Sequence, residues 1–400
     1  MPHDPNRPRP AARGYPQAVA LVAGLFVVSL LLGAAGAVVP APPRLPASAF
    51  LLGAFFIATG IFQRLFPDGG FVSWLGGVKV SVASMAWLAG LTLVVGLVPQ
   101  DGGGWYRHVV LSWPFTLSVL LLLANLGLAI WRRSRSLSMR NLGWLAGHAG
   151  MWLVAGAMAA GSSDIVRIRI VGEKGRAVES AFLPADDEMT TPIPLPFALI
   201  LEEFVLDRYP PRLIISTHPS GKTMHTETLT EGMEGGWKGW KWKALRFIPS
   251  ARPKGESFES DPAGKGDFAA LLGFSRDDGA KAAGWLAPET GGKPRRIVLL
   301  EGGWIAGAEA APRLYRSTVT LAMKGGERVR GMVEVNRPFS FRGWKFYQAS
   351  YDTAAGPRSQ VSVIEAVRDP WLPVVWCGVG LLLAGMAYLF ITGLRPRGGA

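Results

Sequence analysis

One histidine stands inside a long apolar run of the chain. His148 lies within residues 141–160, a run long and apolar enough to cross a bilayer as a helix. Trp144 and Trp152 are its neighbours at helical spacing, four residues before and four after it. Neutral imidazole is a good ligand for iron, and aromatic walls suit the face of a porphyrin. Because an ionisable side chain at membrane depth is a functional candidate by default, we interpret His148 as a candidate axial ligand of a haem iron.

Three glycines lie close to this histidine along the same run, at positions 143, 147 and 150. Small residues let two helix backbones approach each other, and a flat ligand can use the same gap. The alternative is a buried histidine that bonds to a neighbouring helix, with glycines that serve packing alone. The residues themselves leave both interpretations open.

The positions of the other histidines limit how many axial haem ligands the chain can supply. No second histidine among the five lies at membrane depth, so a bis-histidine haem needs a ligand from another chain. His108 is a candidate for contact with a haem edge or propionate, since it follows Trp105 and Tyr106 at the outer end of a span. An interfacial aromatic belt explains these residues more simply. His218 and His225 are interpreted as surface residues.

Several classes of enzyme are excluded by missing motifs. Cys377 is the single cysteine, so the chain has no intrachain disulfide, no Cys-x-x-Cys-His haem attachment site and no thiolate zinc site. Gly-x-Ser-x-Gly, His-Glu-x-x-His and the phosphate-binding Gly-x-x-x-x-Gly-Lys-Ser/Thr are absent as well. The acidic runs 186–188 and 202–203 are typical of a solvated loop and a strand edge. We therefore assign no catalytic residue and expect at most a subunit of a larger enzyme.

Composition divides the chain into a membrane part and a soluble part. The chain is 49% hydrophobic, yet residues 17–160 are almost free of acids while residues 161–370 have an ordinary soluble mixture. This contrast predicts a helical bundle in the lipid bilayer and one external domain large enough for its own core. The net charge of +13 is partly expected from cytoplasmic loops. No basic cluster interleaved with aromatic residues occurs in the soluble part, so no nucleic-acid partner is predicted.

Six spans are expected, and a proline- and arginine-rich arm precedes them. The arm, residues 1–16, is predicted to be disordered, and residues 394–400 form a tail. Residues 17–39 contain an Ala-Gly-Ala sequence that suits a signal-peptide cleavage site, but their length favours an uncleaved helix. The predicted spans are 17–39, 46–66, 77–99, 109–131, 141–160 and 371–393.

The arginines between the fourth and fifth spans set the predicted orientation. Residues 132–140 contain four arginines, the strongest cytoplasmic signal in the chain. Placing this loop inside puts both termini in the cytoplasm and residues 161–370 outside. With arginine-rich composition, we expect a multi-pass protein of a bacterial inner membrane with a periplasmic domain.

The external domain has the pattern of strands. Residues 165–171 alternate apolar and polar side chains, as in a half-buried strand. We predict an antiparallel β domain, with a sandwich as one arrangement, inserted before the last span. Residues 250–290, rich in Gly, Asp, Lys and Ser, are predicted to be a long insertion or mobile loop. The other predicted strands are 211–217, 296–300, 314–323, 328–335 and 359–367.

The most distinctive external stretch is 335–352. Its Asn-x-Pro sequence predicts a turn, and the aromatic run 344–348 predicts a strand. A core strand that follows a tight turn and has no special function would show the same pattern. The stretch resembles the signature of the ResB family, half of the system II machinery of cytochrome c biogenesis. The resemblance extends over residues 77–400, through the span ends at 97–100 and 131–133, the position of His148, and the segments 196–210 and 369–373. The residues that match the signature are Asn336, Pro338, Gly343, Tyr347, Gln348, Ser350 and Tyr351.

The resemblance implies both a domain plan and a departure from it. Residues 77–160 would be three spans of a ResB-like core, 161–370 the periplasmic domain and 371–393 the last span. The helices within 17–66 would then be two additional spans, since the common form of the family lacks them.

The resemblance further implies that the chain helps to export haem b and present it to apocytochrome c, together with a ResC-type membrane partner. His148 would supply one axial ligand, with its mate on the partner, and the chain would be part of a cytochrome c synthase. Two alternatives remain. One is a non-catalytic membrane scaffold or partner-binding protein in which His148 is structural, and the other is a haem-containing membrane electron carrier.

Overall fold

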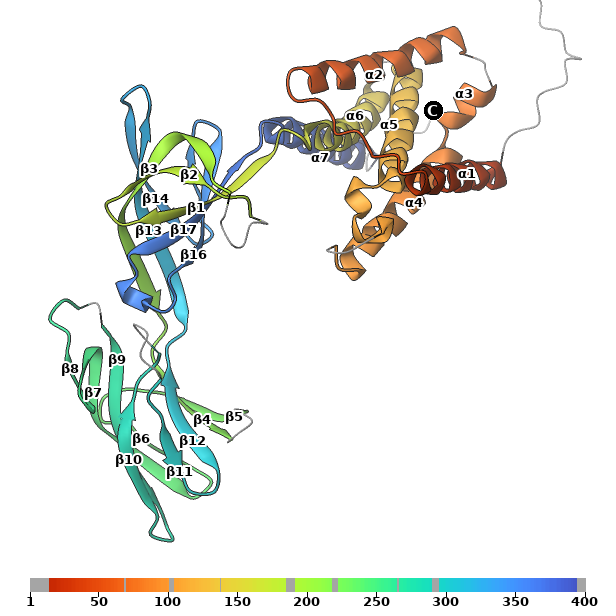
Figure 1. The fold of residues 1–400 in the computed structure, drawn as a ribbon. Helices are drawn as coiled ribbons and strands as arrows, with labels where there is room; N and C mark the ends of the chain where they lie inside the picture. Colours follow the sequence, from red (N-terminus) through yellow and green to blue (C-terminus); the bar gives the residue numbers. More distant parts are fainter. Residues whose placement is uncertain are drawn as a thin grey trace, which may run out of the picture. The chain divides into compact units, whose positions relative to one another are not determined.

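The chain folds into two compact units, one mostly helical and one built of strands (Figure 1). In the computed structural model, the first unit takes residues 1–165 with 369–400, and the second takes residues 166–368. The residues that the structure describes are 14–67, 70–100, 104–136, 138–184, 191–217, 222–264, 266–289 and 295–393.

The described residues of the helical unit contain six membrane-length helices, as the sequence predicts. They have 19 to 23 residues each, or about 30 Å of helix, which matches the hydrocarbon core of a bilayer. By length and hydropathy, all six qualify as spans of a multi-pass membrane protein. They are α1 (Tyr15–Ala34), α2 (Ala47–Leu65), α4 (Val78–Leu97), α5 (Trp113–Arg133), α6 (Met139–Gly161) and α7 (Leu372–Gly393).

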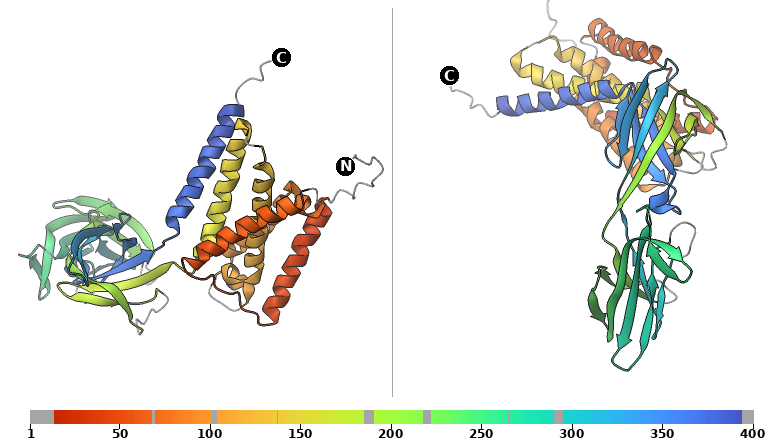
Figure 2. Two further views of the ribbon diagram at one scale, coloured as in Figure 1. Left: turned by 90° about the horizontal axis from the view of Figure 1, so that it is seen from above. Right: turned by 90° about the vertical axis from the view of Figure 1, so that its left-hand side faces the viewer.

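Helix α5 is the centre of this unit and contacts α1, α2, α4 and α6 (Figure 2, left). It is also the most buried of the six. The backbones approach closely where α2 meets α5, because Gly127 of α5 lies against Thr59, and Gly60 of α2 lies against Trp131. Three short elements complete the unit: α3 (Gly70–Leu75), η1 (Trp105–Arg107) and η2 (Val109–Leu111).

The strand unit contains two sandwiches, each with its own core. In the first sandwich, one sheet has the order β1-β17-β16-β15 and the other β14-β13-β3-β2. Apolar side chains of both sheets, among them Leu199, Leu321, Phe346 and Ile364, are fully buried between them. The strands are β1 (Val166–Glu173), β2 (Ala177–Ala181), β3 (Ile193–Arg208), β13 (Pro312–Met323), β14 (Arg328–Glu334), β15 (Phe339–Phe341), β16 (Trp344–Tyr351) and β17 (Val361–Arg368).

The second sandwich is inserted between β3 and β13, two strands that pair with each other in the first sandwich. Its sheets have the orders β10-β9-β7-β6, with β8 added on β7, and β11-β12-β4-β5. All strand pairs of both sandwiches are antiparallel in the described residues. The strands are β4 (Arg212–Thr217), β5 (Thr223–Thr228), β6 (Glu234–Trp237), β7 (Trp240–Lys254), β8 (Ser257–Ser260), β9 (Asp267–Arg276), β10 (Lys281–Leu286), β11 (Val298–Leu300) and β12 (Trp304–Glu309).

The prediction of a loop over residues 250–290 is wrong. This segment contains the end of β7 and all of β8, β9 and β10. Strand β9 is part of the core, since Phe268, Ala270 and Leu272 are buried there. The polar residues that suggested a loop are divided between strands and turns, with Asp277, Asp278 and Gly279 in a turn and Ser275 and Lys281 in the strands on either side of it.

Candidate functional site

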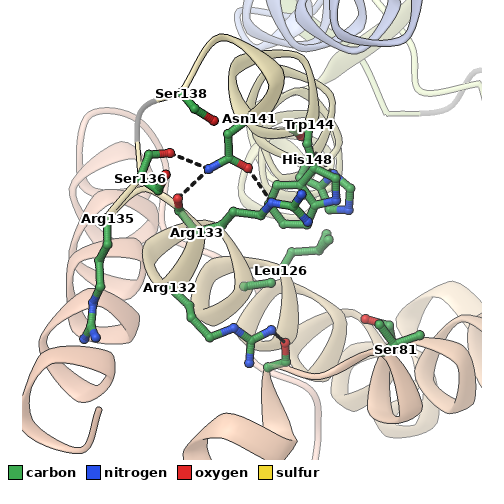
Figure 3. A pocket seen from close by; sticks show the side chains of 13 residues that line it. Ser81, Leu126, Arg132, Arg133, Arg135, Ser136, Ser138, Asn141, Trp144 and His148 are labelled. Carbon is green, nitrogen blue, oxygen red and sulfur yellow. Dashed lines mark hydrogen bonds between the residues drawn. The ribbon is translucent and has the colours of Figure 1, made fainter. Parts of the chain in front are cut away.

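A cavity of about 600 Å³ lies in the helical unit, at the end where α5 turns into α6 (Figure 3). Its walls come from the start of α4, the last turns of α5, the α5–α6 turn and the first turns of α6. This volume is within the range of sites for small organic ligands. The lining residues are Gly76, Val78, Ser81, Leu126, Ala129, Arg132, Arg133, Arg135, Ser136, Ser138, Asn141, Trp144 and His148.

His148 lines this cavity in a defined tautomer. It is nine residues beyond the start of α6 at Met139, which is about 13 Å along the helix. Its Nδ1 atom lies 3.0 Å from the carbonyl oxygen of Trp144. Because a carbonyl oxygen can only accept, Nδ1 must donate, and in the neutral imidazole the lone pair is then on Nε2. No hydrogen bond to Nε2 occurs within the described residues, so this atom is available as a metal ligand.

The indole of Trp144 fixes the plane of the imidazole. The two rings stack at 3.6 Å between centroids with an interplanar angle of 20°. The guanidinium of Arg133 lies over the same indole, 4.6 Å from its centroid, in a cation–π contact. Cation, indole and imidazole therefore lie together at one wall of the cavity (Figure 3).

Asn141 holds the α5–α6 turn and aims Arg133, a role that the sequence analysis missed. Its side chain is buried, and its Nδ2 donates to the carbonyl oxygens of Arg133 and Ser136 at 2.7 and 2.5 Å. Its Oδ1 accepts a hydrogen bond from Nε of Arg133. The sequence did contain a signal for this role, namely an amide side chain in the first turn of an apolar helix. Such a group needs hydrogen-bond partners when it is buried.

The cavity wall is positively charged. Arg132 donates to the carbonyl oxygens of Ser73 and Gly76 at 2.9 and 2.8 Å. Arg135 reaches the other way, to the carbonyl oxygen of Gln63 at 3.0 Å (Figure 3). Among the residues that the structure describes, no Asp or Glu lines the cavity and these arginines form no ion pair.

The glycines near His148 serve helix packing against α7. A Cβ on Gly143 would lie 2.6 Å from the Tyr388 ring, and one on Gly150 would lie 2.5 Å from the Gly378 carbonyl oxygen. A Cβ on Gly385 would strike the backbone of Gly147. This glycine stripe lets α6 and α7 approach, although a Cβ on Gly147 itself would meet nothing within 4 Å, and Trp144 and His148 line the cavity beside α5.

Trp152 also lies away from the cavity. It is buried, donates from Nε1 to the Leu123 carbonyl oxygen at 3.1 Å, and packs against Phe56 with 4.7 Å between ring centroids. It therefore joins α6 to α5 and α2. Of the two tryptophans singled out in the sequence, the structure brings only Trp144 to the histidine.

His108 lines a different cavity, of about 490 Å³, where α1 meets the η1 and η2 segments and the start of α5. Its side chain is exposed, with Trp105 and Trp113 in the same lining. In the strand unit, His225 is partly buried on β5 and lies 3.8 Å from Glu227. His218 and residues 186–188 lie outside the described residues.

The residues of the 335–352 motif have clear structural roles. Asn336, with φ of 63°, and Gly343, with φ of 81°, form the turns on either side of β15. Pro338 follows the first turn, directly before β15. The Gln348 side chain is buried and bonds to Ser317 and Ser362 on the neighbouring strands at 2.7 and 2.8 Å. This polar cluster joins the two sheets of the first sandwich.

The end of the motif lies beside the second sandwich. Tyr351 packs on Phe204 and Tyr315, with 5.1 Å between ring centroids in each pair. Burial raises the pKa of the Tyr351 hydroxyl above its ordinary value, and Arg208 opposes that shift. Tyr347 and Ser350 are more exposed, and the strand register shifts between Gln348 and Ser350.

Comparison with known families gives one result. The model of the ResB-like family matches residues 305–365, from β12 to β17, and this range includes the whole 335–352 motif. No curated protein matches the chain.

Proposed function

We propose, from the premise that this chain belongs to the ResB-like family, that it is the haem-handling membrane subunit of a system II cytochrome c synthase. The family indicates cytochrome c biogenesis and a membrane complex with a partner. In our proposal the partner is a ResC-type protein, and the pair exports haem b and presents it to apocytochrome c.

The observation that carries this proposal is the state of His148. Its Nδ1 atom is held by the Trp144 carbonyl oxygen, its ring is stacked on an indole, and its Nε2 atom is available in a cavity of about 600 Å³. A neutral, oriented imidazole is what an axial ligand of haem iron requires. The residues thus fit haem as cargo, with His148 supplying one axial ligand and the partner supplying the other.

Orientation belongs to the same proposal. The arginines of the α5–α6 turn favour the cytoplasm for this end of the bundle. The His148 cavity would then face the side on which haem b is made available, and the strand unit would lie in the periplasm. There it would contact apocytochrome c or the partner.

A second candidate function is a scaffold without a haem ligand. The roles of Gln348, Asn336 and Gly343 in turns and core packing favour it, since they show that the family motif builds the fold. A haem-containing electron carrier has no such support, because the described spans offer one imidazole at membrane depth.

The test removes the imidazole and keeps the helix. His148→Ala is expressed with a ResC-type partner and a cytochrome c reporter, and His108→Ala is the control at an exposed histidine. We expect His148→Ala to lose most of the Soret absorbance of the purified complex and most of the haem-stained reporter, while His108→Ala keeps both. His148→Gly with added imidazole should recover the Soret band.

The scaffold predicts a different pattern. If His148→Ala kept full Soret absorbance and full reporter maturation, the ligand role of His148 would be wrong. Redox turnover of bound haem with no defect in cytochrome c maturation would favour the electron carrier instead.

A further inference from the structure

We propose that Arg132 and Arg133 form a carboxylate-binding subsite of the His148 cavity, which takes the paired propionate groups of a porphyrin. This inference rests on the proposed function, because haem is the ligand in question. It adds that two residues at the end of α5 recognise the anionic edge of that ligand.

Unbalanced charge is the first reason. Arg132, Arg133 and Arg135 line one cavity with no carboxylate among its described lining residues, and none of them has an acidic partner in the part of the chain that the structure describes. A charge beside an apolar wall at a membrane boundary is costly without a counterion. An anionic ligand is therefore favoured here over a neutral one.

The positive-inside rule alone does not account for the arrangement. That rule requires basic residues at this end of the bundle, and the exposed Arg64 at the end of α2 satisfies it without lining the cavity. Arg132 and Arg133 instead line the cavity, and protein acceptors fix their guanidinium groups there.

The anchoring bonds leave suitable donors unused. Arg133 donates a hydrogen bond from Nε to Asn141. Its two terminal nitrogens, with their four N–H groups, have no hydrogen-bond acceptor among the described residues. Arg132 uses one hydrogen on each terminal nitrogen, for the Ser73 and Gly76 carbonyls. A planar fork of N–H groups matches a carboxylate bidentately, and anchoring lowers the entropy lost on binding.

The rest of the lining fits the body of the same molecule. Val78, Leu126 and Ala129 provide apolar wall, and the Trp144 indole links Arg133 to His148 through direct contacts with both. Guanidinium groups, an aromatic face and an available imidazole nitrogen thus occur in one cavity. A flat, apolar ring with acidic substituents at one edge and a metal at its centre complements all three.

The experiment compares two metal-free porphyrins on the full chain in lipid nanodiscs. Protoporphyrin IX has both carboxylates, its dimethyl ester has neither, and without iron the His148 ligand bond plays no part. Binding is followed by quenching of tryptophan fluorescence. We expect the wild-type chain to bind the diacid about 10- to 100-fold more tightly than the ester, as charge-assisted hydrogen bonds would give.

The arginine variants decide the result. In Arg132→Gln/Arg133→Gln the preference for the diacid should fall to about a tenth of the wild-type ratio or less, and Arg64→Gln, which removes one exposed charge, should keep the wild-type ratio. Arg133→Lys tests the fork in case the double variant misfolds, as size-exclusion chromatography would show. It retains the charge, so an intermediate ratio is expected.

Two outcomes would overturn the inference. One is a wild-type ratio in the arginine variants. The other is a diacid preference that appears only when phosphatidylglycerol is removed from the nanodisc, because the arginines would then serve a lipid headgroup. His148→Ala separates this inference from the proposed function: it should lose the axial signature of bound iron porphyrin and retain the diacid preference.

Discussion

At the scale of single residues, one hydrogen bond decides which nitrogen of the neutral His148 ring keeps its lone pair. Nδ1 of His148 donates a hydrogen bond to the Trp144 carbonyl oxygen at 3.0 Å, and the Trp144 ring covers the imidazole. The residue type and the four-residue spacing singled out this histidine with two tryptophans, Trp144 and Trp152, and the structure stacks only Trp144 on the ring. The Asn141 hydrogen bonds were not, because they depend on the turn between α5 and α6, which has no periodic signal.

Trp144→Leu tests this support without touching the ligand. Loss of the ring stack removes about 1 kcal/mol of stabilisation, so the tautomer and rotamer of His148 are less well fixed. We expect roughly a fivefold loss of haem retention, measured as Soret absorbance per protein after size-exclusion chromatography. Trp152→Phe, which changes an indole outside the cavity, should retain haem; equal losses in both variants would mean that Trp144 acts only through folding.

At the scale of elements, the glycine stripe of α6 sets how closely α7 packs. The sequence indicated glycines beside the histidine but left open whether a ligand or a helix fills the space. That choice depends on which helices become neighbours, and composition does not fix it. The structure shows α7 against the stripe, with backbone atoms of Gly147 and Gly385 in close approach.

Gly385→Ala and Gly380→Ala are a matched pair on α7. A Cβ at position 385 would collide with the backbone of Gly147, whereas one at position 380 meets nothing within 4 Å. Overpacking costs about 1–3 kcal/mol, while alanine at an open helix position is stabilising by up to about 1 kcal/mol. We expect Gly385→Ala to unfold at lower denaturant concentration than wild type in detergent, and Gly380→Ala at equal or higher concentration. The reverse order would contradict the packing of α6 on α7.

At the scale of the whole molecule, the strand unit consists of one sandwich interrupted by another. Alternation of apolar and polar residues predicted strands in both sandwiches, because a two-residue period is a local property of the sequence. It did not reveal that β3 pairs with β13 across the insertion, or that residues 250–290 supply strands of a separate core. Pairings of such long sequence separation leave no trace in the local pattern.

The junction between the sandwiches should respond to alkaline pH. Arg208 forms an ion pair with Asp267, and Tyr351 packs near both. Burial raises the pKa of Tyr351, so the folded chain holds this proton more tightly than the unfolded chain. Its contribution to stability is present below the ordinary tyrosine pKa of about 10 and is lost as pH rises through the higher folded value.

Thermal unfolding of the full chain between pH 9 and 12 measures this loss. Wild type should lose more stability across this window than Tyr351→Phe, which has no proton to release, and ultraviolet difference spectra should show a late-titrating tyrosinate in wild type alone. Parallel stability curves for the two proteins would show that Tyr351 does not titrate in a buried state.

The insertion also constrains the order in which the strand unit acquires its structure. Strands β3 and β13 flank roughly a hundred residues, and closing so long a loop of unfolded chain costs entropy. Once the inserted sandwich has formed, its two ends are neighbours, as the 2.9 Å bond from Tyr209 N to Ala311 O shows. We therefore expect the insert to fold early and to hold β3 ready for its partner. Since β1 pairs with β17, the first sandwich stays incomplete until residue 368 has been synthesised. The edges of its sheets are exposed and unpaired during that interval.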